Sequence, residues 1–349
     1  MSARAPLGIT LGDAAGIGPE IIAKAYRQEP ALLHACVVVG DVDAMRRAAA
    51  LVCPPGQLPL PVAALHAPED WERVPPACIP VWQQGEALAP QTPGRISAQA
   101  GAYAGYCVLQ AARAALRGDL AALVTAPLHK EALAAAGAPY AQYPGHTEML
   151  QAAAAEHLGC STADLPVRMM LASDSLRTVL VSIHVSLREA IDAVCFDSVF
   201  ETVRITHFAL QRLLGRAPRI AVAGLNPHAG EGGRFGSEEA RIITPAVAAA
   251  QAQGWQVSGP WPPDTVFMRA RRTPQDDGAF DVVVAMYHDQ GLIPVKFMGL
   301  EQGVNVTLGL PLVRTSPDHG TAFDIAGTGR ADAASLLAAL RMARALLTS

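Results

Sequence analysis

Three histidines occur where apolar, strand-like runs give way to polar residues. Each falls at or just past the end of such a run: His184 after RTVLVSI, His228 after RIAVAGL, and His288 after DVVVAM. Side chains that follow different strands of one parallel sheet can converge at its carboxyl edge. Neutral imidazole suits Zn, Co, Ni or Fe, and neighbouring carboxylates also tolerate Mg or Mn. The pattern predicts a divalent-metal site. The alternative is three loop histidines bonded to nearby backbone.

The surroundings of two of these histidines favour the metal site. His228 lies in NPHAGEGG and His288 in MYHDQG, and turns that contain glycine let the backbone approach a ligand closely. Asp289 adjoins His288, and Asp264 lies in the turn GPWPPDTVF. Each aspartate is a candidate for a further ligand, an orienting partner of an imidazole, or a general base. A helix cap or turn former is the alternative for each.

A second group of residues is suited to binding anions. PGHTE supplies His146 and Thr147, and a later stretch supplies Lys296, Asn305 and Arg314 among apolar residues. A buried cation without a counter-charge is costly, and the carboxylate and phosphate of a substrate would offset that cost through charge-assisted hydrogen bonds. These residues therefore predict a site for a small anionic substrate. Ordinary surface salt bridges are the alternative.

A glycine-rich loop, DHGTAFDIAGTGRAD, spans Asp318 to Asp332 and precedes an Ala- and Leu-rich segment. Clustered glycines before a helix form a backbone nest suited to a nucleotide phosphate or adenosine. No GxGxxG follows a strand, and the nearest candidate, GDAAGIGPE at Gly12 to Glu20, has different spacing. A dinucleotide would therefore not bind through a Rossmann fingerprint.

The elements that must position these residues alternate along the chain. Short strand-like runs (LGITL, ACVVVG, AALVTAP, RTVLVSI, RIAVAGL, DVVVAM) are separated by segments with helical spacing at 98–116, 237–253 and 331–347. This rhythm predicts an α/β fold with a mostly parallel sheet. The Pro-rich stretch 53–92 is expected to be irregular, with a strand near Ile79, and is not expected to be a domain boundary.

Composition excludes several classes of protein. The 349 residues favour two lobes or one large α/β unit, and 51% hydrophobic residues supply a sizeable core. The net charge of -4, without a basic stripe, argues against nucleic acid as a partner. Six widely spaced cysteines without a CxxC pair indicate free thiols, and no apolar run resembles a signal peptide or a membrane span. We expect a cytoplasmic protein without a membrane partner.

The chain resembles the 4-hydroxythreonine-4-phosphate dehydrogenase family of pyridoxal 5'-phosphate (vitamin B6) biosynthesis. The resemblance runs nearly end to end through GDAAGIGPE, VTAPLHK, YPGHTE, GLNPHAGEGG, GPWPPDT, MYHDQG and GVNVTLGLPLVRTSPDHGTAFDIAG. The glycine-rich loop is also similar to the adenosine-binding loop of isocitrate and isopropylmalate dehydrogenases, whose fold superfamily includes this family. One departure is Ala14, where the family usually has proline; it loosens a turn without removing a functional group.

The resemblance implies a two-lobed α/β/α fold with its active site in the interlobe cleft. A cofactor-side lobe would comprise residues 1–124 and 306–349, and a metal, substrate and dimerisation lobe would comprise residues 125–305. His184, His228 and His288 would bind Zn, Co or Mg, with the third histidine contributed by the partner subunit of a homodimer. The other implied roles are substrate binding by His146, Thr147, Lys296, Asn305 and Arg314, and cofactor binding by Asp324, Ile325, Gly327 and Asp332.

The implied reaction is NAD(P)-linked oxidation of 4-phosphooxy-L-threonine at its C3 hydroxyl, followed by loss of CO2. Asp264, Asp289 or Lys296 would take the hydroxyl proton, and the charge of Asp332 near the adenosine ribose would favour NAD over NADP. Relatives that act on phosphorylated threonate or erythronate, or on a terephthalate cis-dihydrodiol, are the alternative within the family. A metal-dependent phosphohydrolase and a nucleotide-binding regulatory protein are the rivals outside it.

Overall fold

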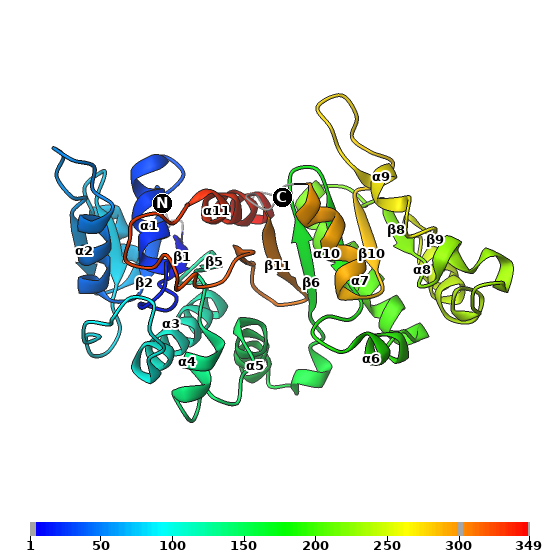
Figure 1. The fold of residues 1–349 in the computed structure, drawn as a ribbon, viewed down its shortest axis with the longest axis horizontal. Helices are drawn as coiled ribbons and strands as arrows, with labels where there is room; N and C mark the ends of the chain where they lie inside the picture. The colour runs from blue at the N-terminus through cyan, green and yellow to red at the C-terminus, as the bar shows by residue number, and fades with distance from the viewer. Residues whose placement is uncertain (1–4, 299–302, 348–349) are drawn as a thin grey trace. The chain divides into compact units, whose positions relative to one another are not determined.

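The computed structural model describes residues 5–298 and 303–347. Its contacts divide the chain into two compact units. Unit 1 comprises Met1–Pro166 and Leu310–Leu347, and unit 2 comprises Val167–Gly309. Both units consist of strands covered by helices, so the predicted α/β class is confirmed (Figure 1).

The strands of unit 1 form a parallel array in the order β3-β4-β2-β1-β5-β12. Their bounds are β1 Leu7–Thr10, β2 Cys36–Val39, β3 Val62–Leu65, β4 Ile79–Trp82, β5 Ala122–Thr125 and β12 Arg314–Pro317. All of these strands except β3 are buried along their whole length, as expected for a parallel sheet covered on both faces. The expected strand near Ile79 is β4, and β3 was not expected.

The helices of unit 1 cover both faces of this array. They are α1 Gly18–Gln28, α2 Val42–Leu51, α3 Ala98–Arg117, α4 Lys130–Ala135, α5 His146–Leu158 and α11 Ala334–Leu347, with 3-10 turns at Pro68–Arg73 and Thr162–Asp164. Helices α1 and α11 lie on one side of the strands, and α3 and α4 lie on the other (Figure 1). The expected helices at 98–116 and 331–347 correspond to α3 and α11. Gly101 lets α3 approach α4 closely, since a Cβ there would lie 2.0 Å from the carbonyl oxygen of Ala132.

The strands of unit 2 follow the order β11-β6-β7-β10-β8-β9. Their bounds are β6 Arg168–Ala172, β7 Arg177–Leu180, β8 Ile220–Ala223, β9 Val257–Trp261, β10 Val282–Ala285 and β11 Val304–Leu308. The pairs β7/β10, β10/β8 and β8/β9 are parallel, while β11/β6 and β6/β7 are antiparallel. The prediction of a mostly parallel sheet is therefore confirmed.

The helices of unit 2 connect these strands. They are α6 Leu187–Asp192, α7 Phe196–Leu214, α8 Thr244–Ala252, α9 Val266–Ala270 and α10 His288–Phe297, with a 3-10 segment Pro227–Gly233 and a π-helical turn Glu239–Ile243. Helix α10 packs on β6, β7 and β10 through Leu292 and Val295, which join a buried cluster with Leu180 and Val283. Among the described residues, no helix is long and apolar enough to cross a membrane.

The boundaries between the units differ in part from those expected. The second boundary, at Gly309, lies close to the expected break between residues 305 and 306. The first boundary lies at Pro166 and not between residues 124 and 125. The reason is packing, because α4 and α5 both pack against α3 and stay with unit 1. The assignment of cofactor binding to one lobe and of metal binding to the other stays a prediction.

Asp281 joins the beginnings of β8 and β10 in unit 2. Its buried carboxylate accepts two hydrogen bonds of 2.8 Å from the Arg216 guanidinium and one of 2.7 Å from the backbone N–H of Arg219. Burial raises the pKa of Asp281, but the hydrogen bonds from the two arginines outweigh burial and hold it well below its usual value of 3.8.

We expect Asp281→Asn to lower the free energy of unfolding at pH 7 by about 2 kcal/mol, since it removes charge-assisted hydrogen bonds. A depressed carboxyl pKa stabilises the fold above the unfolded-state pKa, and this contribution is lost progressively as pH falls from about 4 through the lower folded-state pKa. Urea unfolding from pH 7 downward should show the difference from wild type narrowing in acid. Asp277→Asn, at an exposed ion pair with Arg272, is the control. Equal stability of the Asp281 variant and wild type at pH 7 would contradict the account.

Candidate active site

The three strand-end histidines follow three neighbouring parallel strands of unit 2. His184 comes after β7, His288 after β10 and His228 after β8, and β10 lies between the other two strands. The placement of these residues at strand ends is therefore as the sequence predicts. Ligands of α/β sheets gather at this carboxyl edge.

His184 and His288 lie close together. Their ring centroids are 5.7 Å apart, with the planes tilted by 46°. Both line a small cavity of about 260 Å³ together with Tyr287 and Asp289. The Oδ1 atom of Asp289 lies 2.8 Å from Nδ1 of His288. A carboxylate at Nδ1 orients the ring and leaves Nε2 available to a metal, which is one of the roles predicted for Asp289.

His228 does not join this pair. Within the described part of one protomer, no group of three or more histidine, cysteine, aspartate or glutamate side chains could hold a metal ion. The His228 side chain is 61% exposed, and its Nδ1 lies 3.7 Å from a carboxylate oxygen of Glu231. The three predicted ligands are thus divided, within one protomer, into a close pair and a separate histidine.

The backbone at His228 adopts an unusual conformation. His228, Ala229 and Glu231 have φ values of 53°, 53° and 41°, in the left-handed region that residues with a side chain rarely occupy. The buried Glu239 holds the start of this turn, since its Oε1 accepts hydrogen bonds from the backbone N–H groups of Leu225 (2.8 Å) and Asn226 (2.7 Å). Strain of this kind persists where the surroundings enforce it, and it often marks a functional site.

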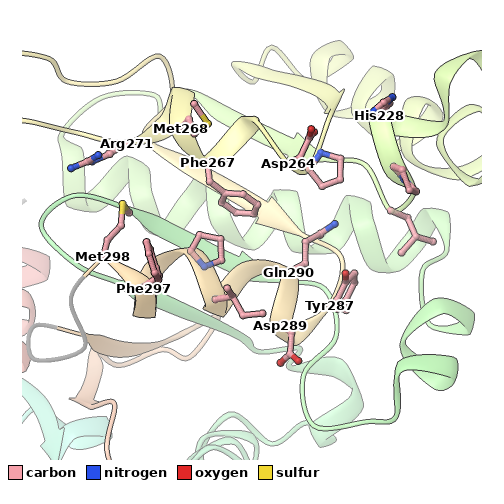
Figure 2. A pocket seen from close by; sticks show the side chains of 15 residues that line it. His228, Asp264, Phe267, Met268, Arg271, Tyr287, Asp289, Gln290, Phe297 and Met298 are labelled. Carbon is pink, nitrogen blue, oxygen red and sulfur yellow. The ribbon is translucent and has the colours of Figure 1, made fainter.

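A larger cavity of about 820 Å³ lies beside His228 in unit 2. In Figure 2, His228 and Asp264 lie near one end of its lining, and Phe297 and Met298 lie near the other. Asp264 is exposed on the loop that follows β9. Its carboxylate therefore shares a cavity with His228, while Asp289 lines both cavities.

Two positioning residues at this edge were not predicted from the sequence. Gln290 accepts a 2.7 Å hydrogen bond from the Met286 N–H and donates a 2.8 Å bond to the Gly224 carbonyl, which links the ends of β10 and β8. Ser182 donates a 3.0 Å hydrogen bond to the Met286 carbonyl and so links the segment after β7 to the segment after β10. Both are ordinary polar residues beside the histidines, and nothing in the spacing distinguishes them.

In unit 1, three of the predicted substrate residues lie at the ends of buried elements. His146 and Thr147 begin α5, and Arg314 begins β12. Arg314 is 4% exposed and donates hydrogen bonds of 3.2 and 2.7 Å to the Thr125 hydroxyl at the end of β5. Burial lowers the pKa of Arg314 to about 10, opposed by the charge of Glu148, so the guanidinium remains a cation at neutral pH.

The charge of Arg314 affects the protonation of His146. Burial, and then the charge of Arg314, lower the pKa of His146 well below 6.5, so the imidazole is neutral at pH 7. Its Nε2 atom is buried and has no hydrogen-bond partner among the described residues. A buried polar atom without a partner is unusual in a folded protein and is consistent with a bound group. The pair therefore supplies a cation and an unsatisfied imidazole nitrogen in a buried part of unit 1.

The remaining predicted substrate residues belong to unit 2. Lys296 lies in the last turn of α10, and Asn305 lies in β11 opposite Leu171 of β6. Both are partly buried. It stays a prediction that these two residues and those of unit 1 bind the same substrate.

The glycine-rich loop has no regular secondary structure before α11, as expected. Asp324 and Gly327 are exposed, and Ile325 is half-buried. The Asp332 carboxylate accepts a 3.0 Å hydrogen bond from the N–H of Ala334, the first residue of α11. Asp332 therefore stabilises the turn that leads into α11, and its predicted contact with the cofactor stays a prediction.

Comparison with known proteins identifies relatives along nearly the whole chain. The family model described as pyridoxal phosphate biosynthetic protein PdxA matches residues 32–343. A 4-hydroxythreonine-4-phosphate dehydrogenase of Beijerinckia indica subsp. indica is 52% identical over 95% of this chain and 92% of its own. A D-threonate 4-phosphate dehydrogenase of Salmonella typhimurium is 44% identical over 97% of this chain and 98% of its own.

The fold agrees with these sequence matches. The crystal structure of 4-hydroxythreonine-4-phosphate dehydrogenase from Klebsiella pneumoniae superimposes with a TM-score of 0.83 at 41% identity, covering 98% of this chain and 99% of that chain. The resemblance inferred from the motifs is confirmed. The chain belongs to the PdxA family of pyridoxal phosphate biosynthetic proteins.

Proposed function

We propose that this chain is a metal-dependent, NAD(P)-linked dehydrogenase that oxidises 4-phosphooxy-L-threonine to 2-amino-3-oxo-4-phosphooxybutanoate. That β-keto acid then loses CO2 and gives 3-amino-2-oxopropyl phosphate. The observation that carries the proposal is the pair of imidazoles, His184 and His288, at the ends of adjacent parallel strands in a chain of this family.

The residues of unit 2 fit a divalent metal such as Zn, Co or Mg. The two imidazoles supply nitrogen donors, and Asp289 fixes the ring of His288 through Nδ1. When bound, the metal supplies Lewis acidity that lowers the pKa of the substrate hydroxyl and polarises the later ketone. His228 is the proposed third ligand.

The anionic ends of the substrate would bind through buried polar groups. Arg314, oriented by Thr125, offers charge-assisted hydrogen bonds to the phosphate or carboxylate. Neutral His146 would donate or accept at Nε2, with Thr147, Lys296 and Asn305 completing the contacts. One of three side chains, Asp264, Asp289 or Lys296, would accept the C3 hydroxyl proton.

The dinucleotide, NAD or NADP, would accept the hydride from C3 of the substrate. The proposed place for it is the glycine-rich loop, with Asp324, Ile325, Gly327 and Asp332 nearest to the adenosine. Unit 1 would then be the cofactor side, and unit 2 the metal side. The proton would leave the hydroxyl and the hydride would leave C3. When CO2 departs, the electrons of the broken C–C bond would pass to the ketone as an enolate, and a proton from solvent would then add at C2 to give 3-amino-2-oxopropyl phosphate.

A homodimer would complete the metal site. No three donors gather within the described part of one protomer, so a histidine from a partner subunit would complete the set. Large apolar side chains that line the same cavity as His228 suit such an interface: Ile293 is 62% exposed, Met268 74% and Phe297 92%. A monomeric mass for the active protein by light scattering would contradict this proposal.

Six free cysteines fit a reducing compartment, and we place the protein in the cytoplasm.

The substrate is the property that separates this proposal from the alternative within the family. We expect the purified protein to form NADH or NADPH from 4-phosphooxy-L-threonine with a higher kcat/KM than from D-threonate 4-phosphate, erythronate 4-phosphate or a terephthalate cis-dihydrodiol. A preference for one of the other substrates would still identify the protein as a dehydrogenase, but its role would not be the biosynthesis of pyridoxal phosphate. Phosphate release without reduced dinucleotide would instead indicate a phosphohydrolase. Tight binding without turnover would indicate a regulatory protein.

A further inference from the structure

The first motif, Gly12 to Glu20, has no role in the proposed reaction, yet it packs directly on the glycine-rich loop. The backbone N–H of Ile17 donates a 3.0 Å hydrogen bond to the Thr321 carbonyl. A Cβ on Gly16 would lie 2.9 Å from the Cβ of Thr321, so only glycine allows this approach without a shift. The start of the loop is thus fixed to the segment that follows β1.

The end of the loop is held by two side chains of α1. Glu20 is 3% exposed, and its carboxylate accepts hydrogen bonds from the backbone N–H groups of Gly327 and of Gly329, the latter at 3.1 Å. Lys24, one turn further along α1, donates hydrogen bonds to the carbonyl oxygens of Gly329 (2.7 Å) and Ala331. Gly329 is therefore held at both its N–H and its carbonyl group.

These contacts fix a backbone that would otherwise be free to vary. Gly327 and Gly329 have φ values of 78° and 69°, a region that glycine enters easily and also leaves easily. The carboxylate of Glu20 lies in the first turn of α1, where the helix dipole favours negative charge, so the buried anion is stabilised. Both Glu20 and Gly327 line a cavity of about 290 Å³ in unit 1.

We propose that Glu20 and Lys24 are positioning residues that hold the glycine-rich loop in the conformation that binds the dinucleotide. This inference rests on the proposed function, because it takes the loop to be the cofactor site. Neither side chain needs to touch the dinucleotide. They bind the loop before the cofactor arrives, so the entropy of ordering Gly327 to Ala331 is lost on folding and not on binding.

The test uses the full-length protein with Glu20→Gln and Lys24→Met, which keep the size of each side chain. Isothermal titration calorimetry with NAD and with NADP should give a Kd about tenfold higher for each variant. The kcat at saturating dinucleotide should be unchanged, because the chemistry occurs elsewhere. Hydrogen exchange should accelerate in the peptide covering residues 325–332 and not in α3 or β5. Arg117→Met, which removes an exposed ion pair with Asp119, is the matched control.

The outcomes separate this inference from the proposed function. Wild-type protein that binds a dinucleotide, with variants that bind it equally well, overturns the positioning role and leaves the function intact. Wild-type protein that binds neither dinucleotide overturns both. Exchange that accelerates throughout unit 1 indicates a general folding defect and also overturns the local role.

Discussion

Replacing His288 with alanine should lower kcat by about a thousandfold and remove bound metal from the purified protein. The imidazole of His288 lies 5.7 Å from that of His184 and is the nitrogen donor whose ring is held by Asp289. Without it, the metal loses a ligand and the substrate hydroxyl loses its activation. Metal content by atomic emission and kcat by dinucleotide absorbance measure the two effects together.

Replacing Asp289 with asparagine should have a smaller effect on metal binding and rate than replacing His288 with alanine. The amide can still accept a hydrogen bond but carries no charge, so we expect a loss of about 10- to 100-fold in metal affinity or rate, as for other partners that orient a metal-binding histidine. His66→Ala, at an exposed histidine after β3 of unit 1, is the control. A His288 variant that retains both metal and rate would mean that the catalytic metal lies elsewhere or that the reaction needs none.

Arg314→Met should lower kcat/KM for the phosphorylated substrate by about 100- to 1000-fold, with little change in the KM for the dinucleotide. The buried guanidinium is held by the Thr125 hydroxyl and is the cation that we assign to the anionic substrate. Steady-state kinetics with each substrate varied in turn measure the effect. Arg113→Met, at an exposed pair with Glu156, is the control.

The Arg314→Met variant should also change the pKa of His146, which NMR measures independently of the kinetics. The charge of Arg314 contributes to the low pKa of His146, so its removal should raise that pKa while burial still keeps it below 6.5. An NMR titration of the His146 ring measures this. Unchanged kinetics, despite a raised His146 pKa, would show that Arg314 lies near His146 but does not bind the substrate.

The strand-end histidines could be predicted from the sequence because the runs before them are apolar and buried. β8 and β10 are four-residue apolar strands, each followed by a polar turn. By contrast, β12 has the sequence RTSP, and its burial depends on hydrogen bonds such as those from Arg314 to Thr125 and from Thr315 to the Ala339 carbonyl. Hydrophobic periodicity cannot reveal a strand of that kind.

Contacts between segments distant in the chain also could not be predicted from the sequence. Glu20 and Lys24 show the spacing of any surface helix pair, and only the fold brings the glycine-rich loop over them. The left-handed run at His228 depends on Glu239, which no local pattern connects to it. The separation of His228 from His184 and His288 within one protomer likewise follows from three-dimensional structure and not from strand order.

The measurement that tests the central claim most directly is reduced dinucleotide formation from 4-phosphooxy-L-threonine by the purified full chain. It is made before chelation, after chelation, and after addition of zinc, cobalt or magnesium. The account predicts turnover that chelation abolishes and a divalent metal restores, with one CO2 released for each dinucleotide reduced. Turnover that survives complete removal of metal, or no reduced dinucleotide under any of these conditions, would contradict it.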